Sequence, residues 1–105
     1  MFRWRKRKCR GRKLRGVYLG VIPEIKALIP HPKMSDDVIM LNLAEAEALR
    51  LVDYEDVSFD EAARKMGTSK ATVWRLTKSA RRKIARALFE GKALVLTEGG
   101  IVERI

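Results

Sequence analysis

The chain has a single cysteine, Cys9, and a single histidine, His31, among its 105 residues. One cysteine cannot form an intrachain disulfide, so a disulfide-stapled secreted fold is excluded and a reducing, cytoplasmic setting is expected. A metal site could be imagined from Cys9, His31, Asp36 and Asp37, but their spacing matches no zinc pattern. We therefore expect no metal site, with Cys9 as a free thiol and His31 on the surface.

Long apolar runs and glycine-rich phosphate loops are also missing. The apolar stretch at residues 17–29 is interrupted by Pro23, Glu24 and Lys26, so we expect neither a membrane span nor a signal peptide. The pair Gly99-Gly100 lies between two predicted strands and does not open a helix, so it is not a phosphate loop. No constellation of catalytic residues is present either. We expect a protein that is not an enzyme, has no cofactor and does not enter a membrane.

Positive charge is what the chain has in excess, with a formal net charge of +10. Residues 1–33 carry eleven Lys or Arg against one acid, residues 34–57 carry one basic residue against seven acids, and residues 58–105 carry eleven basic residues against five acids. Two basic blocks that flank an acidic one suit a molecule with one face toward a polyanion and another toward solvent or a partner. Charge alone does not separate DNA from RNA or an anionic membrane.

Residues 58–83 have the pattern of a helix-turn-helix. Ala63 supplies the small side chain that two steeply crossed helices need where their backbones approach, and Gly67 suits the left-handed residue that ends a helix. The side chains predicted to pack inward between the two helices are Phe59, Ala62, Met66, Val73 and Leu76. The opposite face is basic and polar. A plain helical hairpin with a solvated basic face is the alternative interpretation.

Both helices of this motif have start signals of their own. Ser58 followed by Glu61 is a capping-box pattern, and Ser69 is the expected N-cap of the second helix. The second helix is predicted to run from Lys70 to about Glu90, with Gly91 closing it. The helix-turn-helix therefore spans about residues 58–90.

A further helix is predicted to begin after Asn42, which forms a capping box with Glu45, and to end near Tyr54. It would complete a three-helix core. Its acidic residues are expected mostly as a solvated face away from DNA, with docking to a protein as the alternative. They are Glu45, Glu47, Asp53, Glu55 and Asp56.

The expected fold class is mainly α: a three-helix helix-turn-helix core with a C-terminal β-hairpin and a short N-terminal strand. Residues 17–29 can give one or two short β segments. Residues 93–97 and 101–105 are predicted to pair as a hairpin over about residues 93–105. A lone hairpin is marginal in water, so it is expected to pair with other parts of the chain or with a second copy, and we expect a homodimer.

Residues 1–16 are expected to be a basic flexible arm, and residues 17–105 a single helix-turn-helix domain. Phe2 and Trp4 stand among arginines in this arm, which favours contact with nucleic acid, because aromatic rings stack while guanidinium groups bind phosphate. A solubilising tail is the alternative.

The runs 41–55, 58–76 and 79–94 resemble a family of small, uncharacterised prokaryotic proteins predicted to bind DNA, whose helix-turn-helix is similar to region four of sigma factors. Pro23-Glu24 and Pro30 after an arginine-rich start also fit that family. The resemblance implies a winged or tri-helical domain that regulates transcription and is not a true sigma factor. It also implies the recognition positions Ser69, Lys70, Ala71, Trp74, Arg75 and Lys78. The arm is more basic than the family leads us to expect, and no activity is carried over from the cofactor-related domain of some relatives.

The predicted contacts divide by task. Lys70, Thr72 and Arg75 are the candidates for base edges, where Arg suits the two acceptors of guanine. The candidates for phosphates are Arg81, Arg82, Lys83 and Arg86, together with Lys65 and the arm. Three positions stay ambiguous, since Trp74 can face DNA or the core, and Thr72 and Thr77 can bond back to their own helix.

The sequence thus predicts a regulator that reads double-stranded DNA through the major groove. An RNA- or ribosome-associated basic protein is one alternative, favoured by the arm. A module that contacts RNA polymerase through the acidic helix is the other.

Overall fold

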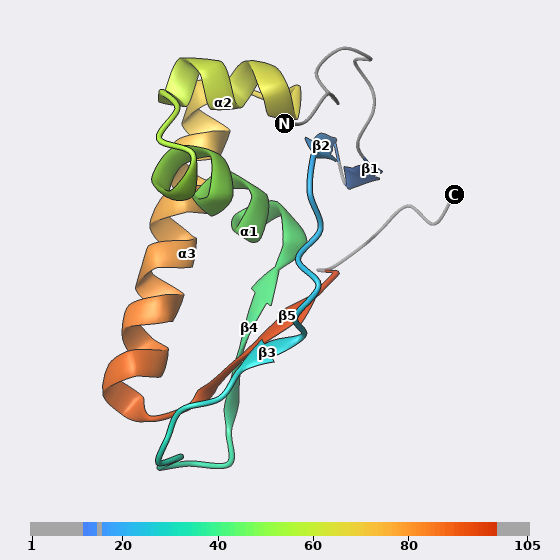
Figure 1. Cartoon of the computed structure of the whole chain (residues 1–105). Helices are drawn as coiled ribbons and strands as arrows, with labels where there is room; N and C mark the ends of the chain where they lie inside the picture. The colour runs from blue at the N-terminus through green and yellow to red at the C-terminus, as the bar shows by residue number, and fades with distance from the viewer. Residues whose placement is uncertain (1–11, 15, 99–105) are drawn as a thin grey trace.

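The computed structural model describes residues 12–14 and 16–98. Helices and strands follow one another along the chain as shown in Figure 1. The strands are β1 (Arg12–Leu14), β2 (Val17–Leu19), β3 (Ala27–Leu28), β4 (Val38–Asn42) and β5 (Ala93–Thr97). The helices are α1 (Leu43–Leu49), which continues into the π-helical turn η1 (Arg50–Tyr54), then α2 (Phe59–Met66) and α3 (Lys70–Glu90).

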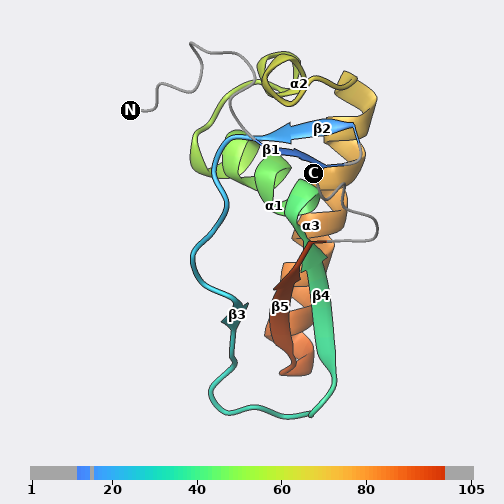
Figure 2. The same cartoon turned by 90° about the vertical axis from the view of Figure 1, so that its right-hand side faces the viewer.

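A three-stranded sheet in the order β3-β5-β4 lies against α3. β5 pairs in parallel with β4, from Val38 opposite Ala93 to Asn42 opposite Thr97, and antiparallel with the short β3. A parallel pair needs a long crossover, and α1, α2 and α3 together provide it. β1 and β2 form a separate antiparallel pair beside α1 and α2 (Figures 1 and 2).

The expectation of a mainly α fold is wrong, because the domain is a mixed α/β one with three helices and this sheet. The strand that changes the class is β4. Its run Val-Ile-Met-Leu is too short and too uniformly apolar for periodicity to separate a strand from a helix start. β4 also passes into α1 with no loop, since Asn42 is the last residue of the strand and the N-cap of the helix.

The predicted C-terminal hairpin is corrected in a similar way. Residues 93–97 do form a strand, but its partners are β4 and β3. The second predicted strand, residues 101–105, lies outside the described residues. The expected N-terminal β segments within residues 17–29 are present as β2 and β3. Of the predicted arm, residues 12–14 form β1, whereas residues 1–11 and 15 lie outside the described part of the chain.

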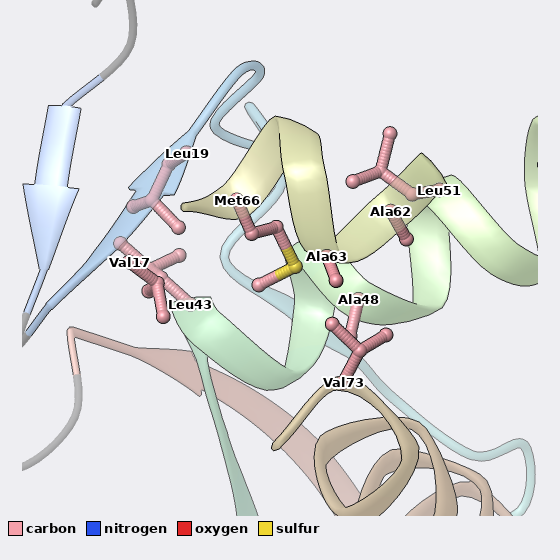
Figure 3. Close-up of a cluster of buried hydrophobic side chains, with 9 residues drawn as sticks. All are labelled: Val17, Leu19, Leu43, Ala48, Leu51, Ala62, Ala63, Met66 and Val73. Carbon is pink, nitrogen blue, oxygen red and sulfur yellow. The ribbon is translucent and has the colours of Figure 1, made fainter. Parts of the chain in front are cut away.

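Two apolar clusters form the core. The larger one brings β2 and the helices together, and Figure 3 shows Met66 of α2 among side chains of β2, α1 and α3. Its buried members are Val17, Leu19, Leu43, Ala48, Leu51, Ala62, Ala63, Met66 and Val73. The smaller cluster joins the sheet to α3 through Ile39, Leu41, Leu94 and Ala80. The second half of α3 therefore rests on the sheet, and its first half rests on α1 and α2.

Candidate nucleic-acid interface

The bend between α2 and α3 is built from the residues that the sequence pattern indicated. Gly67 adopts a left-handed conformation with φ +68°, and its amide donates back to the last turn of α2. Ser58 and Ser69 cap α2 and α3 by accepting hydrogen bonds from the amides of Glu61 and Thr72. α3 runs from Lys70 to Glu90 and ends at the left-handed Gly91. The predicted bounds of both helices are confirmed.

The inward face of this unit is apolar and closed. Ala62, Met66 and Val73 are fully buried, and Ala63 is nearly so. Phe59 and Leu76 are partly buried and pack against the same cluster. Because this stripe faces inward, the remaining sides of α3 are free to carry polar and charged groups toward solvent.

Most predicted recognition residues share the exposed side of the first turns of α3. Ser69, Lys70, Ala71, Arg75 and Lys78 are exposed, and Thr72 is half-buried. Trp74 is 49% exposed, which resolves its ambiguity in favour of the outward position. Arg82, about one turn beyond Lys78, is exposed as well. These side chains form a common surface, which we call the α3 outer face: Ser69, Lys70, Ala71, Trp74, Arg75, Lys78 and Arg82.

A short hydrogen-bonded chain positions Arg75 on the α3 outer face. The Ser69 hydroxyl donates to Thr72 Oγ1 over 2.9 Å, and Arg75 Nη2 donates to the same oxygen over 3.3 Å. Thr72 thus bonds to neighbouring side chains one turn away on either side. A guanidinium held at one end loses less side-chain entropy when it binds a ligand with the other.

Trp74 and Lys78 form a second pair on the same face. The Lys78 ammonium lies 4.8 Å from the centroid of the Trp74 ring, within cation–π range. The contact holds a large exposed ring beside a positive charge. Such a pair can bind a sugar-phosphate backbone by combining apolar contact with charge neutralisation.

Arg81 does not point freely toward solvent, because it pairs with Asp53 at the end of η1. Its Nε and Nη2 donate to the two carboxylate oxygens over 2.9 and 2.7 Å. The hydrogen bonds from Arg81 lower the pKa of Asp53, and the bonded carboxylate raises the pKa of Arg81. Lys70 has a weaker partner in Asp60, at 3.5 Å.

Lys83 is also engaged within the chain. Its ammonium lies 2.8 Å from a carboxylate oxygen of Glu45, whose other oxygen accepts a hydrogen bond from the Ser79 hydroxyl. Of the ten residues predicted to contact DNA, Arg81 therefore bridges to η1 and Lys83 to α1. The others lie on or beside the α3 outer face.

The expectation that the acids of the predicted acidic helix are mostly solvated is wrong for two of them. Glu45 and Glu47 are buried, at 5% and 2% exposure. Glu47 accepts hydrogen bonds from the amide of Gly20 and from Arg50. They hold the fold together, so of these five acids Asp53, Glu55 and Asp56 stay exposed for the alternative of docking to a protein.

The ion pairs of α3 with α1 and η1 could not be predicted from the sequence, because no local spacing indicates them. Glu45 and Lys83 are 38 residues apart, and Asp53 and Arg81 are 28 apart. The one available signal was the excess of acids in residues 34–57 between two basic blocks.

A metal centre finds no support among residues 12–14 and 16–98, which contain no group of three His, Cys, Asp or Glu side chains that could hold an ion. His31, Asp36 and Asp37 are exposed, and Cys9 lies outside the described residues. Within the same part of the chain, no helix combines the length and the apolar composition needed to cross a bilayer.

Comparison with known proteins gives a family without a stated activity. A family model described as "Protein of unknown function DUF134" matches residues 1–104. A "UPF0251 protein" of Archaeoglobus fulgidus is 61% identical over 105 residues and is covered, like this chain, over its full length. A UPF0251 protein of Thermococcus kodakarensis is 42% identical over 78% of this chain and 75% of its own. One of Methanosarcina acetivorans is 38% identical over 91% and 88%. No solved structure matches the chain.

Proposed function

The chain belongs to this uncharacterised prokaryotic family, described as protein of unknown function DUF134, and we propose that it is a DNA-binding protein that inserts the start of α3 into the major groove. The observation that carries the proposal is the division of α3 into two sides. Val73, Thr77 and Ala80 are buried, while Lys70, Arg75 and Lys78 are exposed on a rigid helix.

The α2–α3 unit supports this reading further through its construction. Its left-handed Gly67, its small Ala63 at the helix approach and its capped second helix are what a helix-turn-helix requires. We further propose that this unit is of the type found in region four of sigma factors and that the protein regulates transcription. A binding role, without catalysis, would place it in the cytoplasm, where prokaryotic DNA lies.

The contacts divide by the freedom of each side chain. Arg75, held by Thr72, is the candidate for two guanine acceptors, with Lys70 and Thr72 beside it. Arg82 and Lys78 are the candidates for phosphates, together with Trp74 as an apolar contact to a sugar or a thymine methyl. Arg86 is hydrogen-bonded to Glu90 and would join them only after leaving it. Arg81 and Lys83 would reach phosphate only after leaving Asp53 and Glu45, so we assign them a smaller share.

Selection of bound duplexes from a random pool, followed by salt titration of the winners against scrambled DNA, tests the proposal. We expect a consensus sequence that Arg75→Ala relaxes at one base pair, by about 1–3 kcal/mol of discrimination. Arg82→Ala is expected to weaken all sequences alike. Failure to enrich any sequence, with tighter binding to structured RNA at equal salt, would reject major-groove reading in favour of an RNA-associated role.

A further inference from the structure

The apolar stripe of α3 extends beyond the part that the rest of the chain covers. Val73, Thr77 and Ala80 lie on one side of the helix and are buried. Ile84 and Leu88 continue that side at intervals of four residues, yet they are 36% and 72% exposed. The core cluster around α1 includes Val73, but neither Ile84 nor Leu88.

Ile84 and Leu88 instead line two neighbouring hollows. The larger has a volume of about 530 Å³ between α3, η1, β5 and residues 21–28, and the smaller, of about 380 Å³, lies toward residues 28–34. Leu28, Ile84 and Leu94 line both. Figure 2 shows the segment that contains β3 running beside β5, and residues of this segment, among them Leu28, line the hollows. We call the two hollows together the apolar trough.

Six apolar or aromatic side chains that line the apolar trough are more than half exposed: Ile25, Leu28, Ile29, Met34, Tyr54 and Leu88. At about 100 Å² of accessible area each, a rough figure for large side chains, they present roughly 600 Å². This reaches the upper end of what a monomer usually exposes as one patch and approaches the roughly 800 Å² that one partner contributes to a standard interface.

Charge excludes nucleic acid and acidic peptides as occupants of the trough. Its charged lining residues are Arg50, Asp53 and Lys92. Arg50 is held by Glu47 and Glu55, Asp53 by Arg81, and Lys92 by Glu90. Because each charged lining residue already has an ion-pair partner, the trough offers apolar surface and no positive electrostatic potential that would attract a polyanion.

We propose that the apolar trough is the homodimer interface, covered by the same trough of a second copy. The trough combines a hollow with a projecting side chain, since Leu88 lines the smaller hollow and is nevertheless 72% exposed. A two-fold contact uses one patch on both copies, so the Leu88 side chain of each copy can enter the hollow of the other. The roughly 600 Å² that one copy exposes approaches the roughly 800 Å² that each partner contributes to such a contact.

The distance between Leu88 and Arg75 along α3 suits this dimer to binding two DNA half-sites, a role that rests on the proposed function. Leu88 lies thirteen residues beyond Arg75, or about 20 Å at 1.5 Å per residue. A two-fold axis near Leu88 therefore allows two copies of Arg75 to lie up to about 40 Å apart. That range includes the separation of about 34–36 Å between half-sites one turn of DNA apart.

Sedimentation equilibrium of the full chain tests the interface directly. We expect the wild type to dimerise and Leu88→Glu to raise the dimer dissociation constant about 30-fold or more, because each copy would place a carboxylate in the partner's hollow. Met40→Glu is the matched control. Met40 is 57% exposed on β4, does not line the trough and should leave the constant within about threefold.

Circular dichroism of each variant tests whether it folds. If Leu88→Glu does not fold, Leu88→Ser replaces it in the experiment. A wild type that stays monomeric at several hundred micromolar overturns the inference. The occupant of the trough would then be a ligand or another part of the same chain. A dimer weakened by Met40→Glu and not by Leu88→Glu also overturns it. Both results leave DNA binding intact, whereas a dimer that binds no duplex rejects the proposed function alone.

Discussion

The Lys83 ammonium and the Glu45 carboxylate lie 2.8 Å apart and join the middle of α3 to the first turn of α1. The Glu45 side chain is 6% exposed and also accepts hydrogen bonds from the Ser79 hydroxyl and the Asn42 amide. One carboxylate therefore completes the cap of α1 and holds α3 beside it. The orientation of the α3 outer face depends on a charge pair on the opposite side of the helix.

Lys83→Met should lower the free energy of unfolding by about 2–3 kcal/mol, because it leaves the buried Glu45 carboxylate without its cation. Equilibrium unfolding in urea measures this. Arg82→Met is the control, since Arg82 is the exposed neighbour and makes no ion pair within the described residues. It should cost less than about 0.5 kcal/mol. Equal losses in the two variants would show that the Glu45 pair adds nothing to stability.

The same two variants separate structural from DNA-contacting charges. Arg82→Met should reduce the slope of log affinity against log salt by about 1, since one phosphate contact is lost. Lys83→Met should change the slope much less, because its charge is already neutralised by Glu45. Filter binding of a duplex at several salt concentrations measures both slopes. A larger change for Lys83→Met would mean that Lys83 leaves Glu45 on binding.

Asp53→Asn should strengthen binding to duplex DNA by about fivefold at low salt, because it removes a negative charge and releases Arg81 for phosphate. Asp56→Asn removes the same charge three residues away, at a residue that makes no hydrogen bond or ion pair to α3 within the described part of the chain. It should raise affinity less than half as much. Equal gains in the two variants would assign the effect to net charge and not to Arg81.

Acid should remove the contribution of the Asp53–Arg81 pair. The hydrogen bonds from Arg81 lower the pKa of Asp53 below its ordinary value in the folded state, so the pair stabilises the fold above the unfolded pKa, about 3.9. That stability is lost as the pH falls through the lower, folded value. Both side chains are partly exposed, so the contribution at pH 7 is at most about 0.5 kcal/mol. Urea unfolding of wild type and Asp53→Asn should differ at pH 7 and converge in acid, once Asp53 is protonated in the folded state as well.

Local signals in the sequence were sufficient to predict the helix-turn-helix, and long-range pairings were not. Ser58, Gly67, Ser69 and Gly91 each act through atoms within four residues, so their roles as caps and terminators could be predicted. β4 could not, because its identity depends on pairing with β5, more than fifty residues later. The parallel pair has no turn signal, and the strand passes straight into α1.

The candidate site follows the same division. The exposed positions from Ser69 to Lys78 follow from helical periodicity, since the buried Val73 fixes which side faces out. The partners of Arg81 and Lys83 required the fold, because Asp53 and Glu45 come from elements packed across α3. The apolar trough also required it, since Ile84 and Leu88 continue the core stripe in sequence and differ only in what covers them.

Gly67→Ala should destabilise the fold more than Gly16→Ala, although both glycines have positive φ angles, of +68° and +87°. Each substitution places a Cβ in a left-handed residue, at about 1–2 kcal/mol. A Cβ at Gly16 would meet open space, whereas one at Gly67 would lie 2.9 Å from the Tyr18 ring, so the ring or the bend must shift.

We expect the clash to cost Gly67→Ala about 1 kcal/mol or more beyond Gly16→Ala in urea unfolding. Since Gly67 sets the angle between α2 and α3, Gly67→Ala should also weaken binding to the selected duplex at protein concentrations where it remains folded. Gly16→Ala should bind like the wild type, because its turn lies between β1 and β2 and not in the helix pair. Equal losses of stability in Gly67→Ala and Gly16→Ala would mean that the Tyr18 ring moves aside at no cost in free energy. Unchanged DNA binding by folded Gly67→Ala would mean that the angle of this bend does not position the α3 outer face.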